Sequence, residues 1–384
     1  NNDEGTPNES TTVLKTAADN FTKNVIRIIN NLMNDKTSGK DNTLNVTLDN
    51  VNINASKSNN AALSVEGAGN TTITLSGSNT LTSGNQCAGL EHNGKNYNGS
   101  SDTGKLTITS KKDEAGKDTG SLTATGGGGS AGIGSGWFGT YYGAGTIEIT
   151  GGDIKATGGN NAAGIGSGSE ATSDTHIIIK GTAKIEATAT QNGAGIGSGY
   201  KSKGDTTIDI EGGTIVKAQG GTDGAGIGSG YTDNKDTSTE ITISGGTIVE
   251  AVGGTKGDGI GGSSVNRSSH TTVTISGGTI QKAQGGQGYS IFDGGDGIHS
   301  DGDLIIPGTA TIVSAIGGSG GSDVVVSGAG NGIYSGGKLT ISGGTIGTAQ
   351  GGNATADYKD GGSGIYSVGE LTINSGTIGT AQGG

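Results

Sequence analysis

The chain has 384 residues, of which 83 are glycine and 2 are proline, and 35 acidic against 23 basic residues give it a net charge of −12. The glycines follow no Gly-X-Y period, which excludes a collagen-like triple helix, and the negative charge argues against nucleic acid and anionic lipid as partners. The sequence has no apolar run of about 18 residues, so it predicts no membrane insertion, and its single cysteine, Cys87, excludes a disulfide framework.

Two segments precede the repetitive part of the chain. Residues 1–14 are a polar tail without the apolar core of a signal peptide, and we expect a mature or trimmed N-terminus there. Residues 15–41 carry apolar side chains spaced as on one face of a helix, namely Phe21, Val25, Ile28, Ile29 and Leu32. This spacing predicts a helical cap, with a capping strand as the alternative because β-branched residues are frequent there.

Residues 42–384 form a repeat. A motif close to Ala-Gly-Ile-Gly-Ser-Gly recurs every 31 to 38 residues, with looser copies at Leu63 and Leu90. The clear copies are centred on Ile133, Ile165, Ile196, Ile227, Ile260, Ile298, Ile333 and Ile365. Each period holds this motif and two further strand-like pieces, such as residues 207–211 and 214–219, with no room for a crossover helix. The sequence therefore predicts an all-β, right-handed parallel β-helix of about ten coils.

Alternation within the strands predicts which side chains point inward. Ile208 and Ile210 should lie in the core, with Asp209 between them on the surface. Before the recurring alanine of the third strand, successive coils carry charges of alternating sign, which are Lys155, Glu186, Lys217, Glu250 and Lys282. We expect these charges to form an inter-coil ladder that fixes the register.

The sequence holds little that indicates catalysis. Residues 89–95 and 99–105 match the spacing of a phosphate-binding loop but lack its following Ser or Thr. The Ala-Gly-Ile-Gly-Ser-Gly strand offers no carboxylates to a groove, and we expect the four scattered histidines, His92, His176, His270 and His299, to be solvated. We therefore expect no enzyme activity and no required cofactor, with a polysaccharide lyase or hydrolase as an alternative.

One aromatic cluster stands out in a chain that is 3% aromatic, and it consists of Trp137, Phe138, Tyr141 and Tyr142. Tyr200 and Tyr231 occupy the position of Trp137 in later repeats. Aligned aromatic rings on a rigid face suit stacking on sugars, so these six residues are the predicted ligand site. The alternative is a patch that packs a loop against the rod.

An acidic segment lies where one repeat is longer than the others. Asp293, Asp296, Asp301 and Asp303 fall within a glycine-rich stretch. Carboxylate oxygens on a loop suit calcium, which makes these residues a predicted metal site. A solvated acidic loop is the alternative.

The repeats resemble a known family. Residues 42–56, 71–84 and 105–110, with the AGIGSG, ITISGGTI and ATGG units, are similar to carbohydrate-binding right-handed parallel β-helix proteins of bacterial surfaces. The resemblance covers roughly residues 42–384. It implies an extracellular location, binding of plant or host polysaccharide, and calcium as a structural ion.

These observations together predict a non-enzymatic, secreted or surface-displayed protein that binds glycans or mediates adhesion. The alternative from another class is a filament in which molecules stack end to end, because the last strand-like piece at residue 384 has no capping segment after it.

Overall fold

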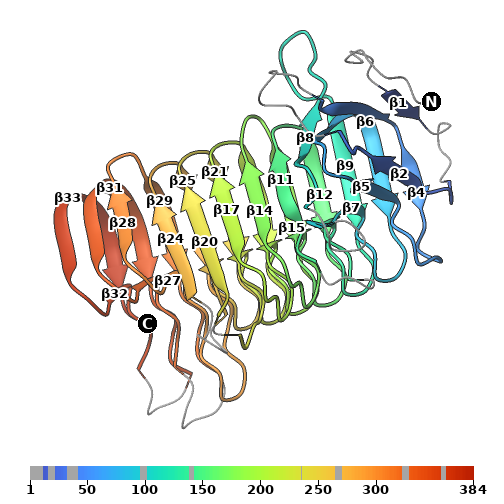
Figure 1. Cartoon of the computed structure of the whole chain (residues 1–384). Coiled ribbons are helices and arrows are strands. Elements are labelled where there is room, and N and C mark those ends of the chain that lie inside the picture. The colour runs from blue at the N-terminus through green and yellow to red at the C-terminus, as the bar shows by residue number, and fades with distance from the viewer. Residues whose placement is uncertain are drawn as a thin grey trace.

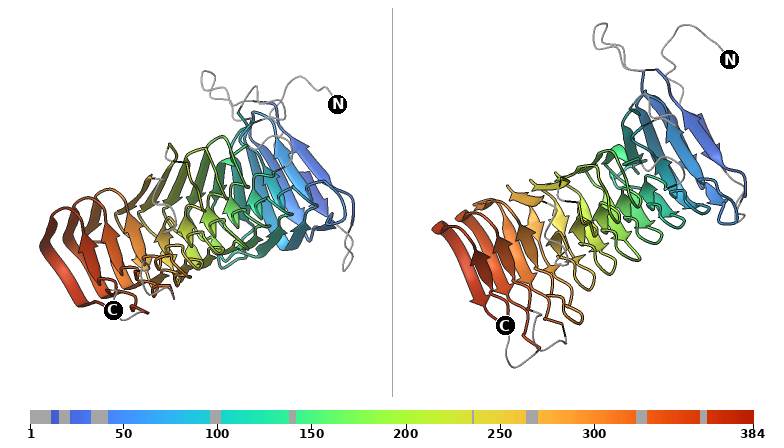
Figure 2. Two further views of the ribbon diagram at one scale, coloured as in Figure 1. Left: turned by 90° about the horizontal axis from the view of Figure 1, so that it is seen from below. Right: turned by 60° about the horizontal axis from the view of Figure 1, so that its bottom comes forward.

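The computed structural model describes residues 12–15, 22–32, 42–95, 102–137, 142–234, 236–263, 270–321, 328–355 and 360–384. Within these ranges the chain winds into a rod of stacked coils built from strands and turns, without a helix (Figures 1 and 2). No helix able to cross a membrane occurs in these same ranges. The predicted parallel β-helix is confirmed.

Each coil runs through three faces in a fixed order, which we call A, B and C. Face A contains β1 (Thr12–Lys15), β3 (Leu44–Asp49), β8 (Leu106–Ser110), β11 (Gly145–Ile149), β14 (Thr175–Ile179), β17 (Thr206–Ile210), β20 (Ser238–Ile243), β24 (His270–Ile275) and β28 (Leu304–Pro307). Face B contains β4 (Asn52–Asn54), β9 (Gly120–Thr125), β12 (Asp153–Thr157), β15 (Lys184–Thr188), β18 (Thr214–Gln219), β21 (Thr247–Ile248), β22 (Ala251–Val252), β25 (Thr279–Ile280), β26 (Ala283–Gln284) and β29 (Thr311–Ile316). Three longer strands cross both faces, namely β6 (Thr71–Thr82), β31 (Leu339–Gln350) and β33 (Leu371–Gln382).

Face C is a separate sheet of 11 strands. Its strands are β2 (Ile26–Ile29), β5 (Leu63–Glu66), β7 (Leu90–His92), β10 (Ile133–Gly134), β13 (Ile165–Gly166), β16 (Ile196–Gly197), β19 (Ile227–Gly228), β23 (Ile260–Gly261), β27 (Ile298–Ser300), β30 (Ile333–Ser335) and β32 (Ile365–Ser367). Strands of successive coils pair in parallel, so that equivalent residues lie one above the next, as Ile177 lies opposite Ile208.

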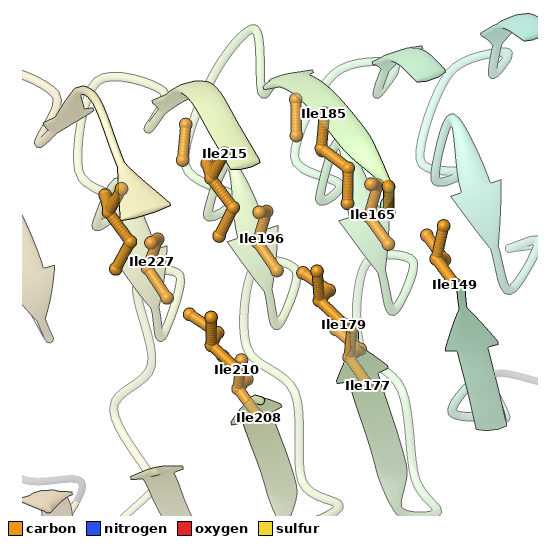
Figure 3. Packing of buried hydrophobic residues seen from close by; sticks show 14 of the residues in the cluster. Ile149, Ile165, Ile177, Ile179, Ile185, Ile196, Ile208, Ile210, Ile215 and Ile227 are labelled. Atoms are coloured by element: carbon orange, nitrogen blue, oxygen red, sulfur yellow. The ribbon is translucent and has the colours of Figure 1, made fainter. Parts of the chain in front are cut away.

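Columns of aliphatic side chains fill the inside of the rod (Figure 3). Ile208 and Ile210 of face A are buried as predicted, and Ile196 of face C and Ile215 of face B point into the same core. Burying one such side chain stabilises the fold by roughly 2 to 3 kcal/mol. Because each coil contacts only its neighbours, that gain depends on the stack rather than on any single coil.

The predicted helical cap is wrong for the part of residues 15–41 that the structure describes. Ile26–Ile29 is strand β2, which pairs in parallel with β5, and Thr12–Lys15 is strand β1, which pairs with β3. Ile28 is buried, while the neighbouring Ile29 is exposed. The open edges of β3 and β5 offer backbone hydrogen bonds, and β-branched residues suit such pairing, so tertiary contact overrides the helical spacing. Phe21 lies outside the described residues.

The predicted charge ladder on face B forms ion pairs at three of its steps. The shortest N–O distances are 3.5 Å from Lys155 to Glu186, 4.0 Å from Lys217 to Glu250 and 3.2 Å from Lys282 to Glu250. All five side chains are partly exposed, so each pair contributes at most about 1 kcal/mol.

Face C changes its construction along the rod. In the middle coils, the residue after the inward isoleucine is a glycine with φ between 134° and 147°, as at Gly197 and Gly228. In the C-terminal coils the same position holds His299, Tyr334 and Tyr366, and the strands there are three residues long rather than two. A positive φ favours glycine, so a side chain at this position requires an ordinary extended backbone.

Candidate functional site

The first coils of face C carry polar side chains where the middle coils have only glycine and serine. Strand β5 contributes Ser64 and Glu66, and strand β7 contributes Glu91. Ser64 lies opposite Glu91 in the parallel register, so Glu66 lies diagonally across from Glu91. These side chains point outward, because the alternate residues Leu63, Val65 and Leu90 are buried in the core.

A cleft of about 390 Å³ lies over these strands. Its further lining includes Arg27 of β2, the turn at 59–61, Asn93, and the pair Lys95 and Thr103 at the base of a longer loop. Lys95 forms an ion pair of 2.7 Å with Asp102 across that base. The cleft therefore has face C strands as its floor, with the turn at 59–61 and the base of the loop after Lys95 beside them.

Glu66 is held as a carboxylate on one side of the cleft. The Arg27 guanidinium donates to both of its oxygens, with Nε to Oε1 at 2.7 Å, and Ser64 Oγ donates to Oε1 at 3.0 Å. The hydrogen bond from Arg27 outweighs partial burial and lowers the pKa of Glu66 below its usual value. Glu66 is thus ionised at neutral pH.

Glu91 has the opposite environment. Its Oε2 accepts the Ala88 N–H at 3.0 Å and lies against Gly136, where an added Cβ would come within 2.5 Å of it. Asn93 Nδ2 is 3.3 Å from Oε1. Burial raises the pKa of Glu91 to about 7, despite these hydrogen bonds. About half of the Glu91 side chains are therefore protonated near neutral pH.

The cleft therefore holds two carboxyl groups whose pKa values are displaced in opposite directions. Such a pair supplies a proton donor and a carboxylate in one site. The nearby Cys87 is not a nucleophile, because burial raises the pKa of its thiol to about 12. Sequence reasoning missed the pair. The available signal was that Glu66 and Glu91 both stand at positions where the four motif copies from Ile133 to Ile227 have glycine.

The predicted aromatic site is only partly described. Phe138 and Tyr141 lie outside the described residues, and Trp137 and Tyr142 are half-buried. Trp137 packs over Gly129, whose added Cβ would come within 2.9 Å of the indole. The Tyr200 and Tyr231 rings stack on each other with centroids 5.4 Å apart.

These aromatics do not form one continuous platform. Trp137, Ser169, Tyr200 and Tyr231 each lie four residues after the inward isoleucine of successive coils, so Ser169 interrupts the series. The tyrosine stack is partly exposed and lies two coils beyond Trp137. Sugar binding by these residues stays a prediction.

The four predicted metal-binding aspartates separate into two groups. Asp293 accepts the Gly328 N–H, and Asp303 accepts the Lys338 N–H at 2.7 Å, so each bonds to the next coil. Asp296 and Asp301 instead flank His299, with distances of 2.6 Å to Nδ1 and 3.0 Å to Nε2.

Among the described residues, Asp258, Asp296 and His299 form the group whose ligand atoms lie within 4.8 Å of one another. All three are buried. Burial alone lowers the pKa of His299, but the Asp258 charge and the bonds to Asp296 and Asp301 raise it to about 10. The ring is therefore an imidazolium that donates both N–H groups, and a protonated imidazole does not bind a metal. The arrangement does not fit calcium, which prefers oxygen ligands alone, and calcium binding stays an untested prediction.

A column of hydrogen bonds explains why Asp258 and Asp296 are buried. In the middle coils the Ala163, Ala194 and Ala225 N–H groups bond to the serine carbonyl four residues later. In the C-terminal coils, where a side chain replaces glycine, the equivalent N–H groups bond to a side chain of the preceding coil. Asp296 N bonds to Asp258 Oδ1 at 2.7 Å, Asn331 N to Asp296 Oδ1, and Ser363 N to Asn331 Oδ1 at 2.9 Å.

Two histidines that were expected to be solvated are buried. His299 is 4% exposed, and His92 is 1% exposed with ring nitrogens 2.7 Å from the Ala144 oxygen and 2.9 Å from the Gly104 oxygen. His176 is half-buried and pairs with Asp209 at 2.7 Å, and His270 is exposed. His92 therefore joins the wall of the cleft to the next coil.

Four segments of the chain match a family model described as Beta helix repeat, at residues 147–169, 208–231, 241–264 and 273–303. Each segment begins in a face A strand and ends after the next face C strand. Comparisons with curated proteins and with solved structures gave no significant match. The matched repeats and the stacked parallel sheets show that the chain is a parallel β-helix protein.

Proposed function

We propose that the chain is a secreted or surface-displayed β-helix protein that binds glycans and so mediates adhesion, and that the N-terminal cleft is its binding site. The cleft carries the proposal, because it places amide, hydroxyl and charged side chains around a hollow of about 390 Å³ on a rigid sheet. Several converging donors and acceptors suit a polyhydroxylated ligand.

The charges favour a neutral glycan over a polyanion. The whole chain carries a net charge of −12, which repels anionic polymers. In the cleft, Arg27 and Lys95 are each already paired with a carboxylate, Glu66 and Asp102. The lining therefore offers hydrogen bonds rather than excess positive charge.

The aromatic residues support the proposal less strongly. One face of Tyr200 is covered by Tyr231, and one side of the Trp137 indole lies against Gly129. A ring face that is covered by protein is not available to stack on a sugar. The cleft and the tyrosine stack therefore make distinct predictions for mutagenesis.

A glycan array followed by calorimetry tests the proposal. We expect the intact chain to bind a neutral polysaccharide, and the cleft-filling variant Ala61→Trp to weaken that binding at least tenfold. The matched variant Tyr200→Ala with Tyr231→Ala should bind within about threefold of the intact chain. All three proteins should melt cooperatively, because Ala61, Tyr200 and Tyr231 all lie outside the core cluster.

Each of the other outcomes contradicts a part of the proposal. Loss of binding in the tyrosine variant alone would move the site to the aromatic stack. Absence of binding by the intact chain, with end-to-end polymers visible by electron microscopy, would favour the filament instead.

A further inference from the structure

We propose that the N-terminal cleft also hydrolyses the glycan it binds, with Glu91 as general acid and Glu66 as the carboxylate that activates water. The inference rests on the proposed function, because a bound glycan is the substrate. It departs from the expectation of a non-catalytic rod, which depended on the absence of carboxylates from the face C motif. That absence holds for the middle coils and fails for β5 and β7.

Glu66 and Glu91 line one cleft from neighbouring strands of face C. The diagonal register of Glu66 and Glu91 separates their Cα atoms by roughly 8 Å, from a strand spacing of about 4.8 Å and two residues of rise. Glu66 leans toward Arg27 on β2, whereas Glu91 leans toward Gly136 beyond β10, on the other side of the sheet order. Both side chains line the same cleft, and inverting glycosidases likewise place their two carboxyl groups on either side of the bond that they cleave.

The contacts assign a different role to each group. Glu91 Oε2 accepts the Ala88 N–H at 3.0 Å and Oε1 accepts from Asn93 Nδ2 at 3.3 Å, so we place the acid proton on Oε1, the oxygen with the longer hydrogen bond. Glu66 is fixed by Arg27 and Ser64 and keeps its negative charge. Arg27 also lines the cleft, and its guanidinium holds the Glu66 carboxylate in place.

The reaction is balanced without any further reactant. The Glu91 carboxyl proton moves to the glycosidic oxygen as the bond from that oxygen to the anomeric carbon breaks. The oxygen of a water molecule bonds to the anomeric carbon, and one proton of this water moves to Glu66. Loss of that proton to solvent and uptake of one by Glu91 restore the starting state.

The pH dependence follows from the two environments. Glu91 must be protonated, and its pKa of about 7 means that this form is lost as the pH rises through neutrality. Glu66 must be ionised, and its lowered pKa keeps it so down to mildly acidic pH. We expect a rate that is highest in mild acid and that falls above about pH 7.

The test uses the full chain with xylan, mannan, mixed-linkage β-glucan and polygalacturonate, and measures binding and new reducing ends separately. Glu91→Gln and Glu66→Gln should each lower the rate of reducing-end release at least about 100-fold, which is typical of a lost acid or base. Glu91→Gln should still bind within about threefold. Glu211→Gln changes an exposed carboxylate in the turn between faces A and B and should cleave as the intact chain does.

The outcomes separate this inference from the proposed function. Binding without release of reducing ends above the level of Glu91→Gln overturns catalysis and leaves the binding proposal standing. Release that continues in both carboxyl variants, or products with unsaturated ends, also overturns it. Absence of binding to every polysaccharide overturns the proposed function itself.

Discussion

The middle coils, residues 131–261, and the C-terminal coils, residues 296–382, share a backbone path but differ on face C. The middle coils use glycine with positive φ and close the turn with a backbone hydrogen bond, as from Ala194 N to Ser198 O at 2.9 Å. The C-terminal coils have a His or Tyr ring at the glycine position. The backbone N–H that bonds to serine in the middle coils there donates to an aspartate or asparagine side chain of the preceding coil. The two substitutions occur together in these coils.

This comparison separates what fixes the coil from what can vary on it. Inward isoleucines such as Ile196 and Ile333 are buried in both regions, so the core is common to them. The turn after the isoleucine is free to change as long as its N–H groups find acceptors. In the first coils the residues after the inward leucine also differ from the middle coils, and there Glu66 and Glu91 line a cleft.

The largest expected effect tests the shared core. Ile196→Asp and Ile333→Asp should each destabilise the rod by more than about 4 kcal/mol, because each buries a charge without a partner. Circular dichroism melts would show loss of the cooperative transition in both variants. Thr222→Asp, at an exposed turn position, should melt nearly as the intact chain does. A mild effect at either isoleucine would show that the two regions do not share one core.

The second prediction exchanges the two turn types. Gly197→Tyr should cost more than about 3 kcal/mol, because φ is 138° there and the added Cβ would lie 1.8 Å from the Gly228 oxygen. Tyr334→Gly should cost only about 1 to 2 kcal/mol, for lost stacking with His299 and Tyr366 and for added backbone freedom. Urea unfolding of both variants measures the difference. Equal costs would contradict the proposed difference in turn geometry.

The third prediction concerns pH and only the C-terminal coils. The raised pKa of His299, about 10 against 6.5 in the unfolded chain, makes the folded state retain a proton. Its contribution is therefore complete below about pH 6.5 and is lost as the pH rises toward 10.

His299→Gln should lower stability at pH 7 by about 2 to 4 kcal/mol and flatten the decline between pH 7 and 10. His270→Gln, at an exposed position, is the matched control and should leave both unchanged. Urea midpoints across this range give the slopes, and an unchanged slope in His299→Gln would contradict an imidazolium in the folded state.

The smallest effect tests the charge ladder, which the C-terminal coils lack. Glu186→Lys places a third positive charge between Lys155 and Lys217 and should cost about 0.5 to 1 kcal/mol at low salt. Thr348→Lys, whose column neighbours are Ser314 and Thr380, should be close to neutral. High salt should remove the difference, and its persistence would point to packing rather than charge.

The sequence was most informative at positions where the equivalent residues of adjacent coils lie next to each other. The inward position of Ile208 and the ladder at Glu186 follow from the period alone, because a parallel stack places equivalent residues in one column. The helical spacing of Val25, Ile28 and Ile29 led to a wrong prediction, because the sequence does not show that the edge of β5 lies beside them.

The candidate site was harder to predict for a related reason. Glu66 and Glu91 stand in the two loosest copies of the motif, so aligning the repeats emphasised Leu63 and Leu90 and not the outward residues. The opposing pKa shifts depend on Arg27 from another coil and on Gly136, which no local pattern joins to Glu91. The burial of His299 likewise depends on Asp258, 41 residues earlier in the chain.

The stacking of identical turns makes the length of this molecule an adjustable quantity. Gly195 and Gly226 hold the same place in consecutive coils, so joining Gly195 directly to Ile227 would excise one whole coil and restore the same local sequence. The cleft at Glu91 and the ring stack at Tyr334 would then approach each other by about 4.8 Å, with neither touched by the deletion. The rod is thus a molecular ruler, on which the distance between two surface features can be set in whole steps without redesigning either one.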